Sequence, residues 1–372
     1  MSWPKVKLGD VAPAIPVKNV NLDEDELVWQ LNLDQIESNT GKIVDKVKQP
    51  LSSAGSSTHF FNNEHVLYSK LRPYLNKVVV PDELGIATTE LVPMKPDQKR
   101  LNKEYLAYYL RSKPFVEWVS TQVSGAKMPR VVMSIFWQHE MPLPPLYEQE
   151  RIVSVLDKSN RLRQKREQAI KLADDFLRAT FLEMFGDPIE NPKGWNVKPL
   201  ADQIVHANNG ISRRRKEDTN EGDIVLRLQD VHYSGIAFDK ELNRIKLVDK
   251  EKQIARVEHD DLLFIRVNGN PNYVGRTAVF KSYIEPVYHN DHLIRIKLDN
   301  EYQSDFLCYL INSPFSRKLI AQQIKTSAGQ HTISQDGILK LMFYRPPIEL
   351  QEKFINIKNK IESIFYRKDK HE

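Results

Sequence analysis

The sequence predicts an α+β fold in which two similar mixed α/β domains are separated by long, antiparallel, coiled-coil-like helices. An internal repeat with a period of about 200 residues indicates a duplicated domain, because solenoid repeats are far shorter. Two segments that each open at a Pro-Pro step are typical of helix starts. The expected segments are residues 1–145 (first domain), 146–186 (central helix), 187–345 (second domain) and 346–372 (C-terminal helix).

The composition is that of a folded, mildly basic chain. Hydrophobic residues make up 41% of the 372 residues and charged residues 28%, so the chain can bury a core and form two or three domains. A net charge of +5 permits a nucleic-acid partner without demanding one. The single cysteine, Cys308, excludes a disulfide framework and a cysteine-based zinc site. Without an apolar signal region or a bilayer-length apolar run, the chain is expected in the cytoplasm, with no membrane partner.

The two copies match at their openings, in a central pair of helices and in the way each ends. The opening positions are Trp3, Leu8 and Asp10 in the first copy and Trp195, Leu200 and Asp202 in the second. Residues 104–123 match residues 305–324, and both read as an amphipathic helix, a break at Pro-Phe and a further helix. A short Gly-containing loop then leads to the shared pattern Pro-Pro-x-x-x-Gln-Glu-x-(Ile/Phe). The β-like stretches between these motifs are residues 66–68, 77–80, 223–226, 262–265 and 293–296.

The central helix is expected from about residue 148 to residue 185, because this segment contains no Pro or Gly. Its apolar seam at heptad-like spacing comprises Ile152, Val155, Ser159, Leu162, Arg166, Ala169, Ala173 and Phe176. The seam of the C-terminal helix comprises Phe354, Ile357, Ile361 and Ile364. The two seams most simply pack on each other; alternatively, each docks on its own domain. Helix breakers in residues 185–195 start the second domain.

This layout resembles the specificity subunits of Type I restriction–modification systems. The resemblance covers essentially the whole chain and rests on the tandem domains, the two Pro-Pro steps that close them, and the junction at residues 185–195. It implies two target-recognition domains, each reading half of a bipartite site in double-stranded DNA. It also implies that the helices set the unread gap and dock two methyltransferase (modification) subunits, which restriction (translocase) subunits then join.

The resemblance further implies a non-catalytic subunit, with S-adenosylmethionine, ATP and Mg in the partner subunits and no cofactor or metal in this chain. The residues expected at partner docking are Pro144, Pro145, Glu148 and Gln149 in the first copy and Pro346, Pro347 and Gln351 in the second. The sequence departs from an even duplication in two ways. Residues 348–351 read Ile-Glu-Leu-Gln where residues 146–149 read Leu-Tyr-Glu-Gln, so the Glu-Gln pair is lost, and the C-terminal helix is shorter.

Two equivalent loops are candidate DNA contacts, although either could be a loop that does not touch DNA. Arg and Asn side chains pair bidentately with guanine and adenine edges, whereas Lys suits phosphates. The candidates are Lys70, Arg72, Tyr74 and Lys77 in the first loop and Arg266, Asn268, Asn270, Tyr273 and Arg276 in the second.

Further candidates lie in basic runs and in the Gly-containing loops. The run Arg213, Arg214, Arg215 and Lys216 suits phosphate binding, because adjacent cations cannot all reach one base edge; a solvated loop is the alternative. The family resemblance implies that the Gly-containing loops face the major groove with Lys127, Arg130, Gln330 and His331. Cations of the central helix could hold a DNA backbone, bind an acidic partner face or form an ordinary exposed face.

A stand-alone DNA nuclease or methyltransferase is the rival hypothesis, and it needs a nucleotide, S-adenosylmethionine or metal site. Residues 270–273 (Asn-Pro-Asn-Tyr) come closest to a methyltransferase motif but lack its second Pro, so a polar turn is expected. His289 and His292 have metal-ligand spacing without a third ligand. A duplicated interaction scaffold that never touches DNA is the other alternative. Because the two domains diverge outside their flanking motifs, an asymmetric bipartite target is predicted.

Overall fold

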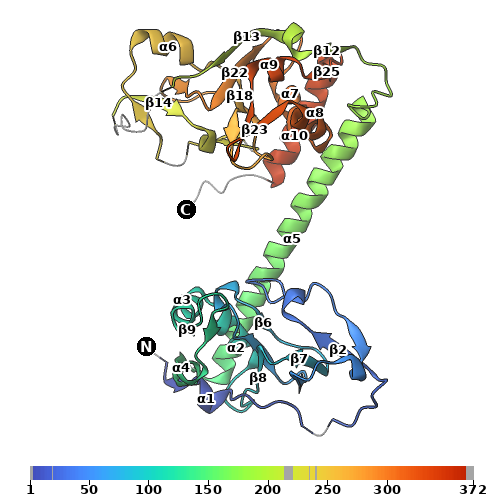
Figure 1. Ribbon diagram of the computed structural model, residues 1–372, viewed down its shortest axis with the longest axis vertical. Helices are drawn as coiled ribbons and strands as arrows, with labels where there is room; N and C mark the ends of the chain where they lie inside the picture. The colour runs from blue at the N-terminus through green and yellow to red at the C-terminus, as the bar shows by residue number, and fades with distance from the viewer. Residues whose placement is uncertain (1–2, 19, 213–220, 234, 239–240, 366–372) are drawn as a thin grey trace. The chain divides into compact units, whose positions relative to one another are not determined.

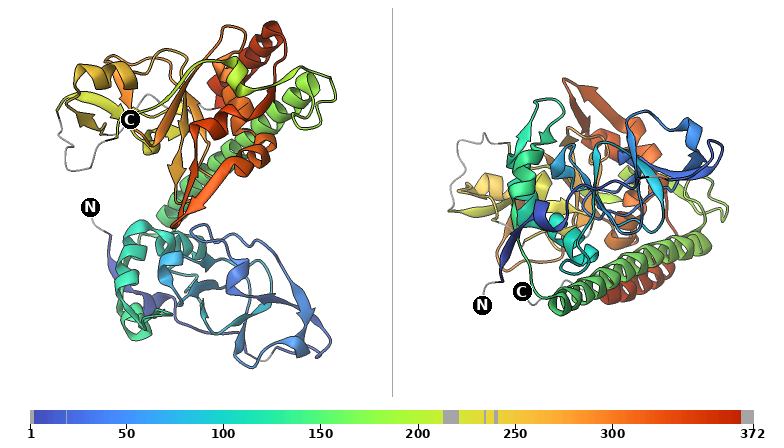
Figure 2. Two further views of the ribbon diagram at one scale, coloured as in Figure 1. Left: turned by 45° about the horizontal axis from the view of Figure 1, so that its top comes forward. Right: turned by 90° about the horizontal axis from the view of Figure 1, so that it is seen from below.

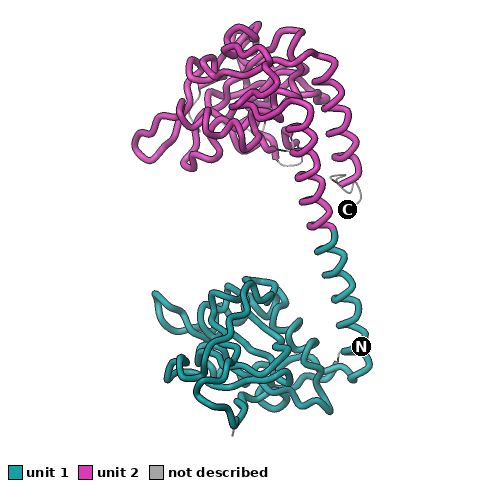
Figure 3. Tube along the Cα trace, turned by 90° about the vertical axis from the view of Figure 1, so that its right-hand side faces the viewer, with its two compact units in different colours: residues 1–165 teal, residues 166–372 magenta. Residues whose placement is uncertain are grey.

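The computed structural model describes residues 3–18, 20–212, 221–233, 235–238 and 241–365 (Figure 1). The chain divides into two compact units, Met1–Lys165 and Arg166–Glu372 (Figure 3). Each unit combines small β-sheets with helices, which confirms the predicted α+β fold. The boundary falls inside one continuous helix, α5 (Leu146–Phe185), so both units include part of it. In the described segments, no helix is both long and apolar enough to cross a membrane.

Unit 1 is built around two sheets with strand orders β3-β2-β7-β4 and β6-β5-β8. The pair β2·β7 is parallel and the other pairs are antiparallel. The strands are β2 (Leu27–Leu31), β3 (Lys48–Pro50), β4 (Thr58–Phe61), β5 (Val66–Ser69), β6 (Val78–Val79), β7 (Gly85–Thr88) and β8 (Leu91–Met94). The helices are α1 (Leu8–Val11), α2 (Lys103–Arg111), α3 (Lys113–Thr121) and α4 (Met133–Gln138), with α5 following.

Unit 2 repeats this plan. Its larger sheets have the orders β13-β22-β18-β20 and β17-β14-β21, and β14·β21 is again the parallel pair. The strands are β13 (Ile204–Asn209), β14 (Asp223–Leu226), β17 (Arg244–Ile245), β18 (Leu262–Ile265), β20 (Thr277–Val279), β21 (Val287–His289) and β22 (Leu293–Leu298). The helices are α6 (Asp249–Ala255), α7 (Ser304–Asn312), α8 (Pro314–Gln323), α9 (Gln335–Leu339) and α10 (Ile348–Phe365).

Strands β5 and β18 are buried on both faces, so they are apolar except for Ser69 at the end of β5. In β18, Leu262 and Phe264 pack into one core cluster, and Leu263 and Ile265 pack into another. In β5, Val66 and Tyr68 pack into one core cluster, and Leu67 packs into another. Successive side chains of a strand point to opposite faces, so β5 and β18 each contribute to two core clusters. One cluster includes the helices α2 and α3 in unit 1, or α7 and α8 in unit 2, and the other includes the second sheet of the same unit.

A short antiparallel clasp joins the first and last strands of each domain body. In unit 1, β1 (Lys5–Lys7) pairs with β11 (Glu140–Pro142), and in unit 2, β12 (Val197–Pro199) pairs with β25 (Met342–Tyr344). Next to each clasp, the Leu8 N–H donates to the His139 carbonyl at 2.9 Å and the Leu200 N–H donates to the Leu341 carbonyl at 2.8 Å. The repeated Leu-x-Asp opening in the sequence therefore marks the point where each domain closes.

A buried glutamine ties each long helix to its domain body. The Gln149 side chain accepts a hydrogen bond from the Asn102 N–H at 2.8 Å and donates to the Arg100 and Pro144 carbonyls at 2.8 and 2.7 Å. Gln351 makes the same three contacts: its oxygen accepts from the Gln303 N–H at 2.9 Å, and its nitrogen donates to the Glu301 and Pro346 carbonyls at 3.3 and 2.8 Å. Both glutamines are fully buried.

These glutamines were expected at partner docking, and in the structure their side chains are used inside their own unit. Gln149 and Gln351 are 0% exposed, and their amide groups are already bonded inside the unit. Pro144 and Pro346 are also buried, and their carbonyls accept hydrogen bonds from those amides. The remaining docking candidates, Pro145, Glu148 and Pro347, keep exposed or half-buried side chains. Their neighbour Tyr147, which the sequence analysis did not select, is 70% exposed.

Helices α5 and α10 pack on each other within unit 2, as predicted, but through a different face of α5. Helix α10 runs antiparallel beside the C-terminal part of α5 (Figure 2), and Phe354 meets Phe181 and Phe185 at ring-centroid distances of 5.4 and 5.8 Å. The buried α5 positions in unit 2 are Ala173, Leu177, Phe181 and Phe185. Most apolar residues of the predicted seam are not buried: Val155, Leu162 and Phe176 are 61%, 61% and 55% exposed.

We predict that Gln149→Ala destabilises unit 1 by about 2–3 kcal/mol, because one backbone N–H and two backbone carbonyls, of which that of Pro144 is buried, lose their partner. Urea unfolding followed by tryptophan fluorescence measures this effect. Glu150→Ala is the matched control, because Glu150 is the next residue and is exposed. Equal unfolding free energies for the two variants would contradict a structural role for the glutamine.

Candidate nucleic-acid interface

The first candidate loop of unit 1 is a tight turn between β5 and β6. It contains a single 3-10 turn, Pro73–Leu75, flanked by Arg72 and Asn76, which both adopt the left-handed conformation (φ +48° and +50°). Arg72 is exposed and Tyr74 is 53% exposed, so both face solvent. Lys77 is half-buried, and its ammonium group donates to the Leu33 carbonyl at 2.6 Å. One of its three N–H donors is therefore already used inside the unit, and its DNA contact stays a prediction.

The Gly-containing loop of unit 1 packs directly against this turn. It is the tip of a hairpin formed by β9 (Val123–Ser124) and β10 (Arg130–Val131). The Arg72 N–H donates to the Pro129 carbonyl at 2.8 Å, and the Val131 N–H donates to the Lys70 carbonyl at 2.9 Å. Two loops that were predicted separately therefore form one surface. We call it the unit 1 surface; its members are Lys70, Arg72, Tyr74, Lys127 and Arg130.

The charges of the unit 1 surface differ in how firmly they are held. Lys127 lies at the exposed tip of the hairpin. Arg130 is 45% exposed and is oriented by Glu90, whose Oε1 accepts from the Arg130 Nε at 3.0 Å and lies 2.9 Å from its Nη2. This acidic partner offsets part of the Arg130 charge, so the cations of Lys70, Arg72 and Lys127 dominate the surface.

The same two loops meet in unit 2. Residues 266–276 connect β18 to β20 and contain β19 (Val267–Asn268), which pairs with β24 (Gln330–Ile333) of the hairpin β23·β24 (β23, Ile324–Ser327). Asn268 lies opposite His331 in this register. The Ile333 N–H donates to the Arg266 carbonyl at 2.9 Å, as Val131 does to Lys70 in unit 1. We call this the unit 2 surface; its members are Arg266, Asn268, Asn270, Tyr273, Arg276, Gln330 and His331.

Several polar side chains of the unit 2 surface serve to shape the loop. The Asn268 side-chain oxygen accepts from the Asn270 N–H at 2.9 Å, and the Asn270 oxygen accepts from the Asn272 N–H at 3.0 Å. These consecutive Asx turns give residues 270–273 a structural role as a polar turn. Arg266 donates to the Asp291 carbonyl at 3.1 Å. Gln330 is exposed, and the His331 ring is held by Thr326 at 2.8 Å.

An arginine flanked by two aromatic rings completes this surface. The Arg276 guanidinium carbon lies 3.8 Å from the centroid of the Tyr233 ring and 4.2 Å from that of the Tyr273 ring. Tyr233 was missed by the sequence analysis, because it lies far along the chain from the loop and no local pattern connects them. The candidate run Arg213, Arg214, Arg215 and Lys216 lies outside the described residues.

The residues that were tested against an enzymatic hypothesis have structural roles. His289 is fully buried, its Nδ1 lies 2.8 Å from the Ala255 carbonyl, and burial lowers its pKa to about 4. Burial also raises the pKa of the Cys308 thiol to about 12, which disfavours the thiolate. Among the residues that the structure describes, no group of three or more His, Cys, Asp or Glu side chains could hold a metal ion.

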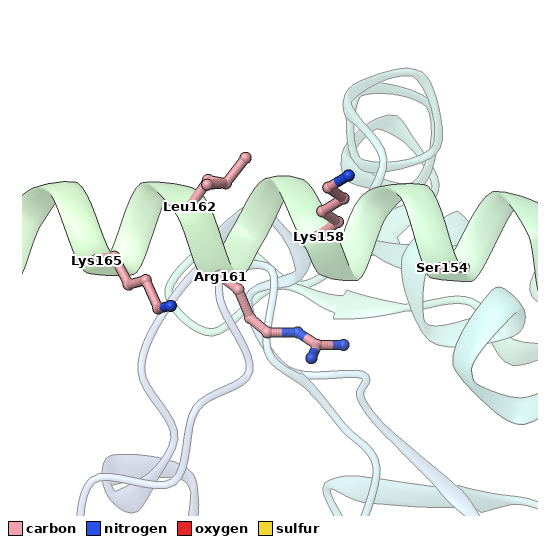
Figure 4. A pocket seen from close by; sticks show the side chains of 5 residues that line it. All are labelled: Ser154, Lys158, Arg161, Leu162 and Lys165. Carbon is pink, nitrogen blue, oxygen red and sulfur yellow. The ribbon is translucent and has the colours of Figure 1, made fainter.

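The exposed part of α5 carries a basic depression. Ser154, Lys158, Arg161, Leu162 and Lys165 line a shallow pocket on this helix, with the cationic side chains extending from successive turns (Figure 4). Leu162 lies among them and is 61% exposed. An apolar side chain between cations is more typical of a protein-binding face than of a DNA-backbone contact.

Comparisons with known proteins agree in finding similarity to Type I restriction specificity proteins. Residues 2–172 match the family model for the Type I restriction modification DNA specificity domain. The chain is 30% identical over 280 residues to the Type I restriction enzyme StySPI specificity subunit of Salmonella potsdam (72% of this chain, 59% of that one). It is 22% identical over 282 residues to the EcoKI specificity subunit of Escherichia coli K12 (72% and 60%). The chain thus spans less than two thirds of the length of these relatives.

Solved structures show the same fold. The S subunit of a Type I restriction–modification system from M. genitalium aligns with a TM-score of 0.59 and 16% identity, covering 99% of this chain and 91% of that one. A chain from a structure that concerns complex assembly and conformational transition of the type I R-M system aligns with a TM-score of 0.55 and 18% identity (98% and 92%).

We predict that His289 makes unit 2 less stable in acid. Its pKa is about 4 when folded and about 6.5 when unfolded, so between these values the unfolded state binds the extra proton. The free energy of unfolding should therefore fall by about 3 kcal/mol as pH drops from about 6.5 to about 4. His289→Gln removes this contribution, whereas the exposed neighbour His292→Gln retains it. Identical pH profiles of chemical unfolding for the two variants would contradict the assignment.

Proposed function

We propose, because this chain is a relative of the Type I restriction enzyme specificity subunits, that it selects the DNA sequence on which a Type I restriction–modification complex acts. The observation that carries the proposal is the repeated surface: in each unit, a turn from the central strand is hydrogen-bonded to a Gly-containing hairpin. Backbone hydrogen bonds of this kind do not depend on side chains, so they can hold loops of different sequence at equivalent positions. Such a scaffold suits a reader whose loops change while its frame stays fixed.

The two surfaces would read different bases. The unit 1 surface presents mainly cations on a turn and a hairpin tip, whereas the unit 2 surface presents amides, a histidine and the ring-flanked Arg276. Cations such as Lys127 suit phosphates, while Arg and Gln side chains suit guanine and adenine edges. We therefore propose an asymmetric bipartite target in double-stranded DNA, one half-site for each unit.

Helix α5 would set the number of unread base pairs between the half-sites. It continues from unit 1 into unit 2 over 40 residues without interruption, and α10 stiffens its C-terminal part through Phe354. Gln149 fixes the start of α5 on the body of unit 1. A rigid helix attached to a rigid body can define a spacing that a flexible linker cannot.

The exposed face of α5 would bind a methyltransferase subunit. Val155, Leu162 and Phe176 lie on one seam at multiples of seven residues and are more than half exposed. Lys158 and Lys165 flank this seam, also seven residues apart. Apolar seams with charged flanks pair with helices of complementary pattern, so the expected partner surface is an amphipathic helix with acidic flanks.

Catalysis would then reside in the partners. Two methyltransferase subunits would supply the S-adenosylmethionine site, and restriction (translocase) subunits would supply the ATP and Mg sites. This chain would contribute recognition and assembly without reacting with the DNA itself. The burial of His289 and the raised pKa of the Cys308 thiol, which disfavours a nucleophilic thiolate, support that division.

We predict that DNA binding by the purified chain depends steeply on salt. A duplex that contains the target should lose roughly a thousandfold in affinity between 50 and 200 mM salt if about six phosphates are contacted. Lys127→Ala should reduce the slope of log affinity against log salt by about one, whereas Lys250→Ala, an exposed cation on α6, should leave the slope unchanged. Fluorescence anisotropy measures both. Undetectable DNA binding would instead favour a DNA-independent scaffold.

We also predict that Leu162→Asp weakens assembly with the methyltransferase subunit, because it places a carboxylate in the apolar seam. Co-purification from cells that express both chains gives the readout. Gln164→Asp is the matched control, since Gln164 is exposed two residues along the same helix, on the opposite side from Leu162. Equal recovery of the partner with both variants would exclude this seam as its binding face.

A further inference from the structure

Arg276 is a half-buried arginine that combines three properties. Its guanidinium is flanked by the Tyr233 and Tyr273 rings at 3.8 and 4.2 Å, which stabilises the cation and restricts its motion. Its Nε is buried and has no hydrogen-bond partner. The two rings themselves remain 55% and 40% exposed, so the group lies at the surface of unit 2.

The loop that carries Arg276 is held rigidly. Arg317 donates two hydrogen bonds to the Val274 carbonyl, both at 3.1 Å, and one to the Pro271 carbonyl at 3.2 Å. Gly275 has φ +77°, and a Cβ atom there would lie 2.6 Å from the Ile320 Cγ2, so the chain passes close to α8. The Arg276 carbonyl accepts from the Ile265 N–H at 2.8 Å, which fixes the end of the loop on β18.

Within the described residues, no oxygen atom accepts a hydrogen bond from the Arg276 guanidinium. Other arginines of unit 2 are paired: Arg244 forms two hydrogen bonds with Glu285, at 2.9 and 2.7 Å, and Arg345 contacts Asp299 at 2.9 Å. A guanidinium that is partly desolvated by two rings and lacks an acceptor costs free energy in the unbound protein. A ligand that offers acceptors in the guanidinium plane removes that cost.

We propose that Arg276 reads a guanine in the half-site of unit 2, an inference that rests on the proposed function. Guanine presents two adjacent acceptors, O6 and N7, on its major-groove edge, and they match the fork of an arginine. A phosphate also offers acceptors, but the fixed orientation between two rings favours a base, because mobile exposed cations suffice for phosphates. Tyr233 and Tyr273 are positioning residues that hold the guanidinium plane.

Unit 1 has no such reader in the corresponding loop. The cation near the end of that loop, Lys77, donates to the Leu33 carbonyl at 2.6 Å. Among the described residues, no aromatic ring packs against its ammonium group. The ring-flanked arginine is therefore a feature of the unit 2 loop, whereas Arg72 in the unit 1 loop is exposed.

The test uses the full chain assembled with its methyltransferase subunits, acting on a randomised DNA library whose methylated members are sequenced. Arg276→Ala is expected to relax one guanine position in one half-site, lowering discrimination there by roughly 5- to 150-fold. Tyr233→Leu is expected to relax the same position to a smaller extent, while Tyr233→Phe retains it. Lys250→Ala, an exposed cation of the same unit, leaves every position unchanged.

Two results would overturn the inference. A uniform loss of methylation with unchanged base preference would mean that Arg276 contacts a phosphate. Relaxation at a base other than guanine, or at none, would mean that it reads something else or nothing. Tyr233→Leu replaces an exposed side chain, so it decides the matter even if Arg276→Ala fails to fold. A wild-type complex that methylates no split motif overturns the proposed function as well, whereas a split motif that Arg276→Ala leaves intact overturns only this inference.

Discussion

The buried amide at the first turn of each long helix is the contact on which the rest of the structure depends. Gln149 and Gln351 each bridge three backbone groups that belong to different parts of their unit: the loop before α2 or α7, and the Pro-Pro step. Because the amide is fully buried, none of these bonds can be exchanged for water without cost. The first turn of each helix is thereby fixed on its own domain body.

The fold itself was largely predictable from the sequence, because a duplication doubles every signal. The apolar runs of β5 and β18, the helix-break-helix segments and the Pro-Pro steps each occur twice, and all of them are present in both units. The packing face of α5 was not predictable. A heptad seam assumes 3.5 residues per turn, whereas the buried positions Ala173, Leu177, Phe181 and Phe185 advance by four, as in packing of a short helical segment against a local core.

The candidate site was predictable as a set of loops but not as a set of contacts. Sequence reasoning selected the turn at Lys70 and the loop at Lys127 separately, and the structure joins them through backbone bonds that leave no trace in side-chain patterns. The same limit applies to the two glutamines: a repeated polar residue at a helix start indicates a specific role, but only the fold shows the internal hydrogen bonds that it makes. The contact between Tyr233 and Arg276 could not be predicted for a related reason, because the two residues lie in different connections between strands.

Charged side chains have two different roles in the two units: some stabilise a domain body, and others lie exposed on loops. Arg295 is almost fully buried, lies 3.6 Å from Asp261 and is bonded to Asn208 and to the Arg256 carbonyl, so it stabilises the body of unit 2. The cations of the recognition surfaces are mostly exposed, and only some are oriented, as Arg130 is by Glu90. Because of this separation, side chains of these loops can be substituted without disturbing the core.

A base-resolved map of N6-methyladenine in DNA shows directly whether this chain selects the target sequence. The comparison is between cells that express the methyltransferase subunits with this chain and cells that express them without it. We expect one split motif, with two different half-sites around an unread gap, to be methylated only when the chain is present. A methylation pattern that is the same with and without the chain would contradict its role in selecting the target.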